Sequence, residues 1–417
     1  MITLSPLDIL STYWLGNSIV PGNPIRDRFL KNFTWDSILK NGQSFEVGPL
    51  LHYILEQIDH QQKKLISNTV RERLKKNYHQ YMYHSMLLHN EVQQALNILQ
   101  EARIKVVVLK GAALAETVYK NIALRPMADI DLLIFKKDLN KAKQALFEIG
   151  FRKIEYRSLR DISNEHPFHL RFIKESSGYP IIIELHWDIA ENPVNVEITE
   201  VMQRAVRANI GGIGAYVMCP DDLLLYLCWH TANHRFPRLI WLCDVAQVIK
   251  VYGENINWDV IIERSKRWRI RKAVYCSLYL AKNVLCAQVP KKVLSSFQIS
   301  NIETQVFQFV MLNMEYKERI MQIRNSLLTI ALKLLIIDGL KERVFFFREL
   351  AFPGISYIKV RYSISKPKLT KLYQFLHPFI LIYEGVSCGL EIITKKKFGV
   401  RRRAWQSPNS ESGQVGK

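Results

Sequence analysis

Two aspartates one residue apart, Asp129 and Asp131, are the residues in this sequence best suited to chemistry. They open a segment, 129–135, that reads as a short β-strand, in which alternate side chains point to the same face. The two carboxylates therefore lie side by side, and like charges repel unless a cation binds between them. A divalent metal ion is the cation that such a pair would hold. We predict a metal site here; solvent-facing carboxylates on a half-exposed strand are the alternative interpretation.

A third acid, Glu184, follows the apolar run 181–183 within another predicted strand, 179–188. A carboxylate at such a position is costly to bury unless it has a partner. Two metal ions about 3.5–4 Å apart can stabilise the attacking and the leaving oxygens of a displacement reaction at phosphorus. We therefore predict Asp129, Asp131 and Glu184 as catalytic metal ligands, with Mg²⁺ or Mn²⁺ as the cofactor.

A lysine and a glycine, Lys110 and Gly111, lie between a β-branched run, 105–109, and a predicted helix, 111–120. A glycine turn at the start of a helix is a common anion site, because free backbone N–H groups point at the ligand. Beside a metal site this arrangement indicates phosphate chemistry. Lys110 has a second interpretation, in which its side chain points to the sheet edge or caps a carbonyl.

Two histidines, His230 and His234, are four residues apart and would share one face of a predicted helix, 223–234. They are interpreted as a zinc-binding pair, as a wall of an acceptor pocket in which Asp244 orients one of them, or as structural histidines. No third ligand lies near them in the sequence, which disfavours zinc. His186, on the same strand face as Glu184, is either a pocket residue or a hydrogen-bonding group of the core.

The elements around these residues change in type along the chain. Residues 1–100 have the apolar spacing of helices, 101–190 alternate strand and helix patterns, and 215–405 return to helices. Residues 406–417 are small and polar, as in disordered tails. We predict an α+β fold with a small mixed-sheet core, 101–190, flanked by helical N-terminal and C-terminal regions.

Charge is the unusual feature of the composition. The chain of 417 residues is long enough for two or three domains, and its 48% hydrophobic content is ordinary. Its net charge, +20 from 58 basic and 38 acidic residues, is not. Residues 351–417 hold 12 Lys or Arg against 3 Glu and include the basic run 395–403. This region is interpreted either as a solvated tail or as a surface for nucleic acid, an acidic partner or anionic lipid.

The sequence lacks the motifs of several protein classes, and their absence disfavours those classes. The six cysteines form no C-x-x-C pair, which argues against a zinc ribbon or a disulfide framework and favours the cytoplasm. We find no signal peptide, and the most apolar segment, 327–337, is too short for a membrane span and contains Lys333. Walker A, dinucleotide-binding, serine-hydrolase and zinc-protease motifs are absent. We expect a cytoplasmic protein without an integral membrane segment.

The order of the features above resembles the polymerase-β-like nucleotidyltransferase superfamily: a glycine turn, a helix, an Asp-x-Asp pair and a strand acid. More narrowly, three segments are similar to an uncharacterised bacterial nucleotidyltransferase family found near some natural-product gene clusters. They are 109–114 (Leu-Lys-Gly-Ala-Ala-Leu), 125–134 (with Asp-Ile-Asp) and 183–187 (Ile-Glu-Leu-His-Trp). Weaker similarities extend the resemblance over most of residues 30–290.

The resemblance implies a metal-dependent transfer of a nucleoside monophosphate from an NTP to an acceptor, with release of pyrophosphate. The three acids would be the metal ligands, and Glu184 would also be a candidate base for the acceptor hydroxyl. Gly111 would let the triphosphate approach the backbone, and Lys110 and Arg125 would neutralise phosphate charge. The acceptor would be a small molecule or a peptide natural product, with RNA and protein as further candidates.

Two features depart from the superfamily pattern. Ala112 stands where a small polar residue usually offers a hydroxyl to a phosphate, and the loop from Gly111 to Asp129 is longer than usual. The phosphate-binding mode therefore follows from the sequence less directly than the metal site.

Two alternative functions use the basic surface instead of the acids. One is a non-catalytic protein that keeps the fold and binds nucleic acid or a partner, and the other is a membrane-surface adaptor that uses the run 395–403. The discriminating feature is geometric, because the enzyme interpretation requires the three carboxylates to converge in one open cleft.

Overall fold

The computed structural model describes residues 6–15, 34–35, 46–58, 66–154, 168–190, 194–236, 238–313, 327–364 and 366–397. The predicted disordered tail, 406–417, lies outside these residues, as does the end of the basic run 395–403.

One seven-stranded mixed sheet carries the predicted site. Its strand order is β3-β4-β5-β2-β1-β7-β6. β2 runs parallel to β5, and β1 runs parallel to β7, whereas the other neighbouring pairs are antiparallel. The strands are β1 (Val107–Val108), β2 (Ile130–Leu133), β3 (Arg152–Lys153), β4 (His169–Ser176), β5 (Tyr179–His186), β6 (Val206–Ile210) and β7 (Ile213–Val217).

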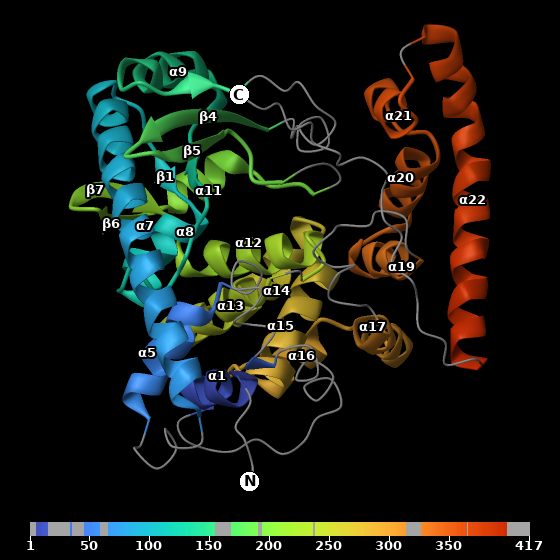
Figure 1. Cartoon of the computed structure of the whole chain (residues 1–417), viewed down its shortest axis with the longest axis horizontal. Coiled ribbons are helices and arrows are strands. Elements are labelled where there is room, and N and C mark those ends of the chain that lie inside the picture. Colours follow the sequence, from blue (N-terminus) through green and yellow to red (C-terminus); the bar gives the residue numbers. More distant parts are fainter. Residues whose placement is uncertain are drawn as a thin grey trace, which may run out of the picture.

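One face of this sheet packs against two helices, α7 (Asn68–Glu101) and α9 (Leu139–Glu148) (Figure 1). Ile130 and Leu132 of β2 are fully buried in this core, as are Ile183 and Leu185 of β5. Because side chains alternate along a strand, the residues between them point to the opposite face. The polar positions of β2 and β5 are therefore directed away from α7 and α9.

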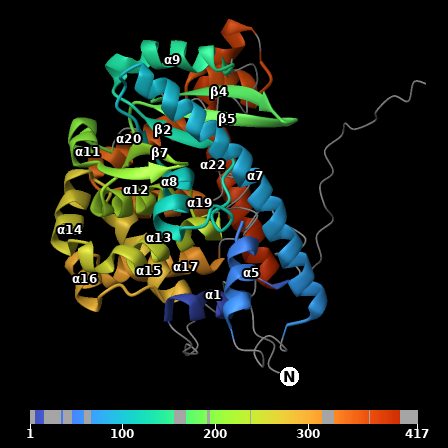
Figure 2. The same ribbon diagram turned by 90° about the vertical axis from the view of Figure 1, so that its left-hand side faces the viewer.

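The opposite face of the sheet meets a helical part of the molecule with its own, larger core (Figures 1 and 2). α7 contributes Leu74 to this second core as well as Leu88 to the first, so the one helix spans both. The helices of this part are α1 (Pro6–Leu15), α5 (Gly48–Gln57), α12 (Pro220–Asn233), α13 (Leu239–Tyr252), α14 (Trp258–Arg267), α15 (Arg271–Leu285) and α16 (Lys291–Ser296).

The connections between strands supply shorter elements. α8 (Lys110–Leu114) follows β1 directly and continues as a π-helical turn, η1 (Ala115–Tyr119), which ends at Lys120 in a left-handed conformation. Two 3-10 turns are η2 (Lys136–Asp138) and η3 (Gly253–Asn255), and α11 (Ile198–Arg204) precedes the hairpin of β6 and β7.

After α16, every regular element in the described part of the chain is a helix (Figure 1). They are α17 (Asn301–Asn313), α19 (Leu327–Ile336), α20 (Leu340–Ala351), α21 (Ile355–Arg361) and α22 (Pro367–Lys397). The most apolar predicted segment is α19, which buries Leu332 and Ile336 in the larger core. Within the described ranges, no helix combines the length and the apolar character needed to cross a bilayer.

The predicted α+β class with a mixed sheet and flanking helices is confirmed. The sheet extends further along the chain than the predicted core, 101–190, because the hairpin of β6 and β7 adds two strands next to β1. Its turn residues, Gly211 and Gly212, both have positive φ angles, 59° and 83°. A Gly-Gly pair between two strands is typical of such a hairpin.

Candidate active site

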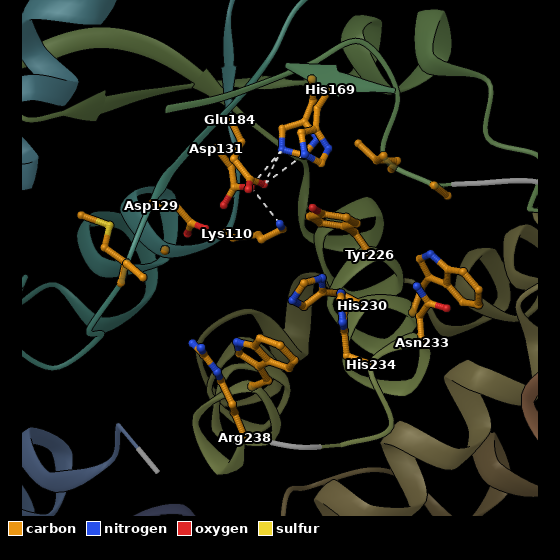
Figure 3. Close-up of a pocket in the computed structure, with 18 of the residues that line it drawn as sticks. Lys110, Asp129, Asp131, His169, Glu184, Tyr226, His230, Asn233, His234 and Arg238 are labelled. Carbon is orange, nitrogen blue, oxygen red and sulfur yellow. Dashed lines mark hydrogen bonds and ion pairs between the residues drawn. The ribbon is translucent and has the colours of Figure 1, made fainter. Parts of the chain in front are cut away.

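A polar pocket lies between the sheet and helix α12 (Figure 3). Its cavity volume is about 260 Å³. Asp129, Asp131 and Glu184 all line it, as do Lys110 and Gly111 from the start of α8. The structure thus brings the three predicted metal ligands together in one cleft, as the enzyme interpretation requires.

Strand register accounts for two of the three acids. Asp131 of β2 and Glu184 of β5 are direct partners in neighbouring parallel strands. Both lie between residues that point into the core beneath α7 and α9, so both face the pocket. Asp129 stands immediately before β2, and the neighbouring loop residues Pro126 to Ala128 also line the cavity.

Lys110 provides the nearest cation to this cluster. Its Nζ donates to Oδ1 of Asp131 over 2.8 Å and lies 5.9 Å from the centre of the Tyr226 ring. Burial alone would lower the pKa of Lys110, but Asp131, Tyr226 and the other two acids hold it well above its usual value. Lys110 is therefore a protonated side chain aimed at the carboxylates, and not a cap on a carbonyl.

His186 belongs to the same cluster. Its Nε2 lies 2.9 Å from Oδ1 of Asp131 and 3.5 Å from Oε2 of Glu184. Burial would lower the pKa of His186, but these two carboxylates raise it. Burial would likewise raise the pKa of Asp131, yet Lys110 and His186 hold it well below its usual range. The predicted acceptor residue His186 is thus placed on the carboxylate side of the pocket.

Asp129 has the opposite electrostatic character. Burial raises its pKa to about 7, and the negative charges of Asp131 and Glu184 add to the effect. Lys110 and the more distant Arg238 lower it only in part. A divalent ion bound here would favour the charged form of Asp129, because a nearby opposite charge stabilises a carboxylate.

Arg125 lines the pocket, but its side chain is already engaged. Its Nε donates to both oxygens of Asp244, over 2.7 and 2.9 Å, and Oδ1 of Asp244 also accepts from the hydroxyl of Tyr119 at 2.9 Å. Asp244 is fully buried and Arg125 is 5% exposed. In one of the three interpretations of His230 and His234, Asp244 orients a histidine of an acceptor pocket. Its oxygens are instead held by Arg125 and Tyr119, and Asp244 is not one of the residues that line this cavity. This buried trio ties the loop before β2 to helix α13.

Packing requires a glycine at position 111, apart from any part that Gly111 plays in binding a ligand. A Cβ built at Gly111 would lie 2.7 Å from the Cβ of Met127, a contact that real Cβ atoms essentially never make. The absent side chain thus lets the loop that carries Asp129 pack against the start of α8.

Replacing Gly111 with alanine is expected to destabilise the fold by about 1–3 kcal/mol, because the added methyl group overpacks this contact. Urea unfolding would measure the change. Gly214→Ala is the matched control, since a Cβ there meets no heavy atom within 4 Å. Equal midpoints for the two variants would contradict the packing argument.

The other side of the pocket is a wall of rings that we call the aromatic wall. It consists of Tyr226, Trp229 and His230 from α12, His234 directly after that helix, and Trp241 from α13. The rings of His230 and Trp241 are 4.5 Å apart, and those of His230 and His234 are 4.7 Å apart. Burial lowers the pKa of His230 well below its usual value, and Lys110 and His234 add to the effect, so the ring is neutral at pH 7. Figure 3 shows both histidines across the cavity from the acids.

The model of an uncharacterised nucleotidyltransferase family matches residues 31–285, more than half of the chain. The chain belongs to this nucleotidyltransferase family. The match begins before α5 and ends at the last residue of α15, so it includes the sheet, the pocket and the aromatic wall. α16 and all later helices lie outside it.

Similarity of this nucleotidyltransferase to individual proteins is low. None of the curated proteins matches it. A crystal structure of ANT(2″)-Ia in complex with adenylyl-2″-tobramycin is 15% identical, with a TM-score of 0.30, over 40% of this chain and 90% of that chain. A solution structure of ANT(2″)-Ia, an antibiotic-resistance factor, is 11% identical, with a TM-score of 0.31, over 45% and 94%. At these TM-scores neither resemblance says anything about what this nucleotidyltransferase binds.

The structure adds two polar residues to the pocket that the sequence did not single out. His169 and Arg171 of β4 both line it, opposite His186 and Glu184 in the antiparallel register. Nε of Arg171 lies 3.2 Å from Oε1 of Glu184 and so fixes that carboxylate. Arg238 lies at the opposite end of the cavity, where it pairs with Glu46 over 2.9 Å.

Proposed function

We propose that this chain transfers a nucleoside monophosphate from an NTP to an acceptor, with a divalent metal as cofactor. The observation that carries the proposal is the convergence of Asp129, Asp131 and Glu184 in one pocket of a nucleotidyltransferase family member. In the reaction, an acceptor oxygen forms a bond to the α-phosphorus, the bond to pyrophosphate breaks, and the acceptor proton passes to the carboxylate cluster.

The donors in the pocket fit Mg²⁺ or Mn²⁺. Both ions prefer carboxylate oxygens, and Asp129, Asp131 and Glu184 supply them from one wall. When bound, such an ion would neutralise phosphate charge and stabilise the attacking and leaving oxygens. The raised pKa of Asp129, caused by burial and by its two acidic neighbours, supports the fit, because a bound cation would relieve the repulsion among the three carboxylates.

The chain's own residues would orient the triphosphate beside this cluster. We assign Lys110 to phosphate contact, because its ammonium group can turn from Asp131 toward a phosphate oxygen within the same pocket. Gly111, which also lines the cavity, leaves its backbone accessible to the ligand. We assign Arg125 to holding the loop through Asp244, a role that its two hydrogen bonds support.

The aromatic wall is the proposed acceptor side. Flat rings, with the neutral imidazole of His230 among them, suit an uncharged or ring-containing acceptor that offers a hydroxyl. A small molecule or a peptide natural product fits a cavity of about 260 Å³ better than a folded macromolecule does. An acceptor bound against this wall would face the carboxylates across the cavity, so its attacking oxygen could point toward them (Figure 3).

Replacing Trp241 with alanine is expected to raise the KM for the acceptor roughly tenfold with a smaller change in kcat. The reason is that an aromatic contact contributes about 0.5–1.5 kcal/mol beyond its buried area. Steady-state kinetics with acceptor and NTP varied separately would measure it. Tyr383→Ala, which removes a ring that is 74% exposed on α22, is the control. A rise confined to the KM for the NTP would assign the wall to the nucleotide instead.

Transfer itself can be tested on the full chain with the four NTPs, each labelled at the α-phosphate, against a panel of hydroxyl-bearing small molecules, peptides and RNA. Label in an acceptor together with released pyrophosphate, both lost on addition of EDTA, is the expected result. NTP binding that needs no divalent ion and gives no labelled product across the panel would overturn the proposal. Label found only in RNA would keep the reaction and replace the proposed acceptor class.

A further inference from the structure

Two histidines and an acid from neighbouring strands converge beside the proposed catalytic acids. His169 of β4 is the direct cross-strand partner of His186 of β5, and Glu184 lies two residues before His186 on the same face. Nε2 of His169 is 3.9 Å from Oε2 of Glu184, and Nε2 of His186 is 3.5 Å from that oxygen. One ligand atom from each of the three residues lies within 4.8 Å of the other two.

These separations are close to those of a metal site. Zinc–nitrogen and zinc–oxygen bonds of about 2.0–2.2 Å in tetrahedral geometry place the ligand atoms about 3.4 Å apart. The distances from Glu184 to the two histidines exceed this value by a few tenths of an ångström, which small side-chain rotations can close. The side chains of His169 and His186 are only 3% and 4% exposed, and that of Glu184 is 15% exposed.

The surrounding contacts orient the carboxylate for this purpose. Arg171 holds Oε1 of Glu184, which leaves Oε2 directed at the two imidazoles. Strand pairing fixes the backbones of all three residues, so the site needs no folding of a loop. The cluster opens into the pocket, where a further ligand from solvent or substrate could complete the coordination.

The donor set differs from that of the two aspartates. Asp129 and Asp131 offer oxygen only, which suits Mg²⁺ and Mn²⁺, whereas imidazole nitrogen favours later first-row metals such as Co²⁺ and Zn²⁺. Two inequivalent metal positions can therefore exist side by side, with Glu184 at the boundary between them.

We propose that His169, Glu184 and His186 form a nitrogen-rich metal site that binds Zn²⁺, or Co²⁺ in its place, in preference to Mg²⁺. The site goes beyond the proposed function, because it requires neither nucleotide nor acceptor and includes His169, which has no assigned part in transfer. It shares Glu184 with the proposed metal ligands of transfer, and its His186 also contacts Asp131 of that cluster.

The test is a titration of metal-free, full-length protein with Co²⁺, followed by visible absorption and then by competition with Zn²⁺ and with Mg²⁺. One equivalent of Co²⁺ is expected, displaced by stoichiometric Zn²⁺ and not by millimolar Mg²⁺. His169→Gln is expected to weaken binding at least about a hundredfold, since even the loss of a residue that only orients a ligand costs 10–100-fold. His79→Gln, at an exposed position on α7, is the matched control.

Either of two results in this titration would overturn the inference. One is displacement of Co²⁺ by Mg²⁺ as readily as by Zn²⁺, which would indicate oxygen ligands. The other is loss of Co²⁺ binding in His230→Gln but not in His169→Gln, which would assign the metal to the pair His230 and His234. X-ray absorption of the wild-type protein loaded with Zn²⁺ needs no variant: two imidazoles in the first shell support the site, and a shell of oxygen alone refutes it.

The metal titration and the nucleotidyl-transfer test can fail independently of each other. Imidazole-dependent Co²⁺ binding in a chain that transfers no label would refute the proposed function and keep this site. Label transfer in a chain whose Co²⁺ binding is unchanged by His169→Gln would support the proposed function and refute this metal site.

Discussion

Replacing Asp131 with asparagine is expected to lower the rate of nucleotidyl transfer at least about a thousandfold, because metal-ion stabilisation of the transferring phosphate contributes several kcal/mol. Asp131 is the most enclosed of the three acids, at 3% exposed, and both Lys110 and His186 contact its Oδ1. Asparagine keeps the shape of the side chain but cannot carry the charge that a divalent ion requires. Transfer of labelled nucleoside monophosphate, under single-turnover conditions, measures the loss.

Folding has to be separated from catalysis in this experiment. Removal of the Asp131 charge leaves Lys110 and His186 without their main counter-charge, so thermal unfolding of the variant should be recorded beside its activity. Asp259→Asn, which neutralises an exposed acid on α14, is the matched control and is expected to retain full activity. A folded Asp131→Asn variant with at least a tenth of the wild-type rate would exclude Asp131 as a metal ligand.

Replacing Asp244 with asparagine is expected to destabilise the fold by about 3–5 kcal/mol, the usual cost of breaking a buried ion pair by removing one partner. Asp244 is fully buried, and its loss would leave the Arg125 guanidinium without its counter-charge. Urea unfolding with two independent probes measures the effect. The double variant Arg125→Met with Asp244→Leu is expected to recover most of the stability, because it removes both charges.

The double variant also distinguishes between two roles for Arg125. If Arg125 holds the loop before β2, the charge-free double variant should bind NTP within a few-fold of the wild type. A large loss of NTP affinity in a stably folded double variant would instead give Arg125 the phosphate contact that the family resemblance implies. Fluorescence titration with a labelled NTP in the presence of Mn²⁺ distinguishes the two results.

The convergence of the three acids could be predicted because its causes are local. Alternation of apolar and acidic residues sets the face on which Asp131 and Glu184 lie, and each stands in a short, strongly apolar strand. The parallel pairing of these two strands depends on the tertiary structure, and neither segment contains a sequence pattern that indicates it. The family resemblance supplied that link.

His169 was missed, although the sequence carries a signal for it. Ser177 and Gly178 form a two-residue turn, with φ angles of 51° and 78°, and place Ser176 opposite Tyr179. Counting outward from this turn in both directions pairs His169 with His186. A hairpin turn of two residues fixes this register, and a glycine at position 178 is typical of such a turn.

The ion pair between Arg125 and Asp244 had no such signal. The two residues are separated by 119 positions, and each stands in an unremarkable local context. Only the packing of α13 beneath the loop before β2 brings them together. This is why Asp244 was predicted to contact a histidine that lies closer in the sequence.

The long helix α7 has a mechanical consequence for substrate entry. Its 34 residues extend about 51 Å at 1.5 Å per residue, and it is anchored in both cores, through Leu74 at one end and Leu88 to Leu99 at the other. The pocket lies between the two parts that this strut joins. Opening the pocket by a hinge would require α7 to bend, which an uninterrupted helix resists. The helix α7 therefore opposes any opening of the pocket by separation of the two parts.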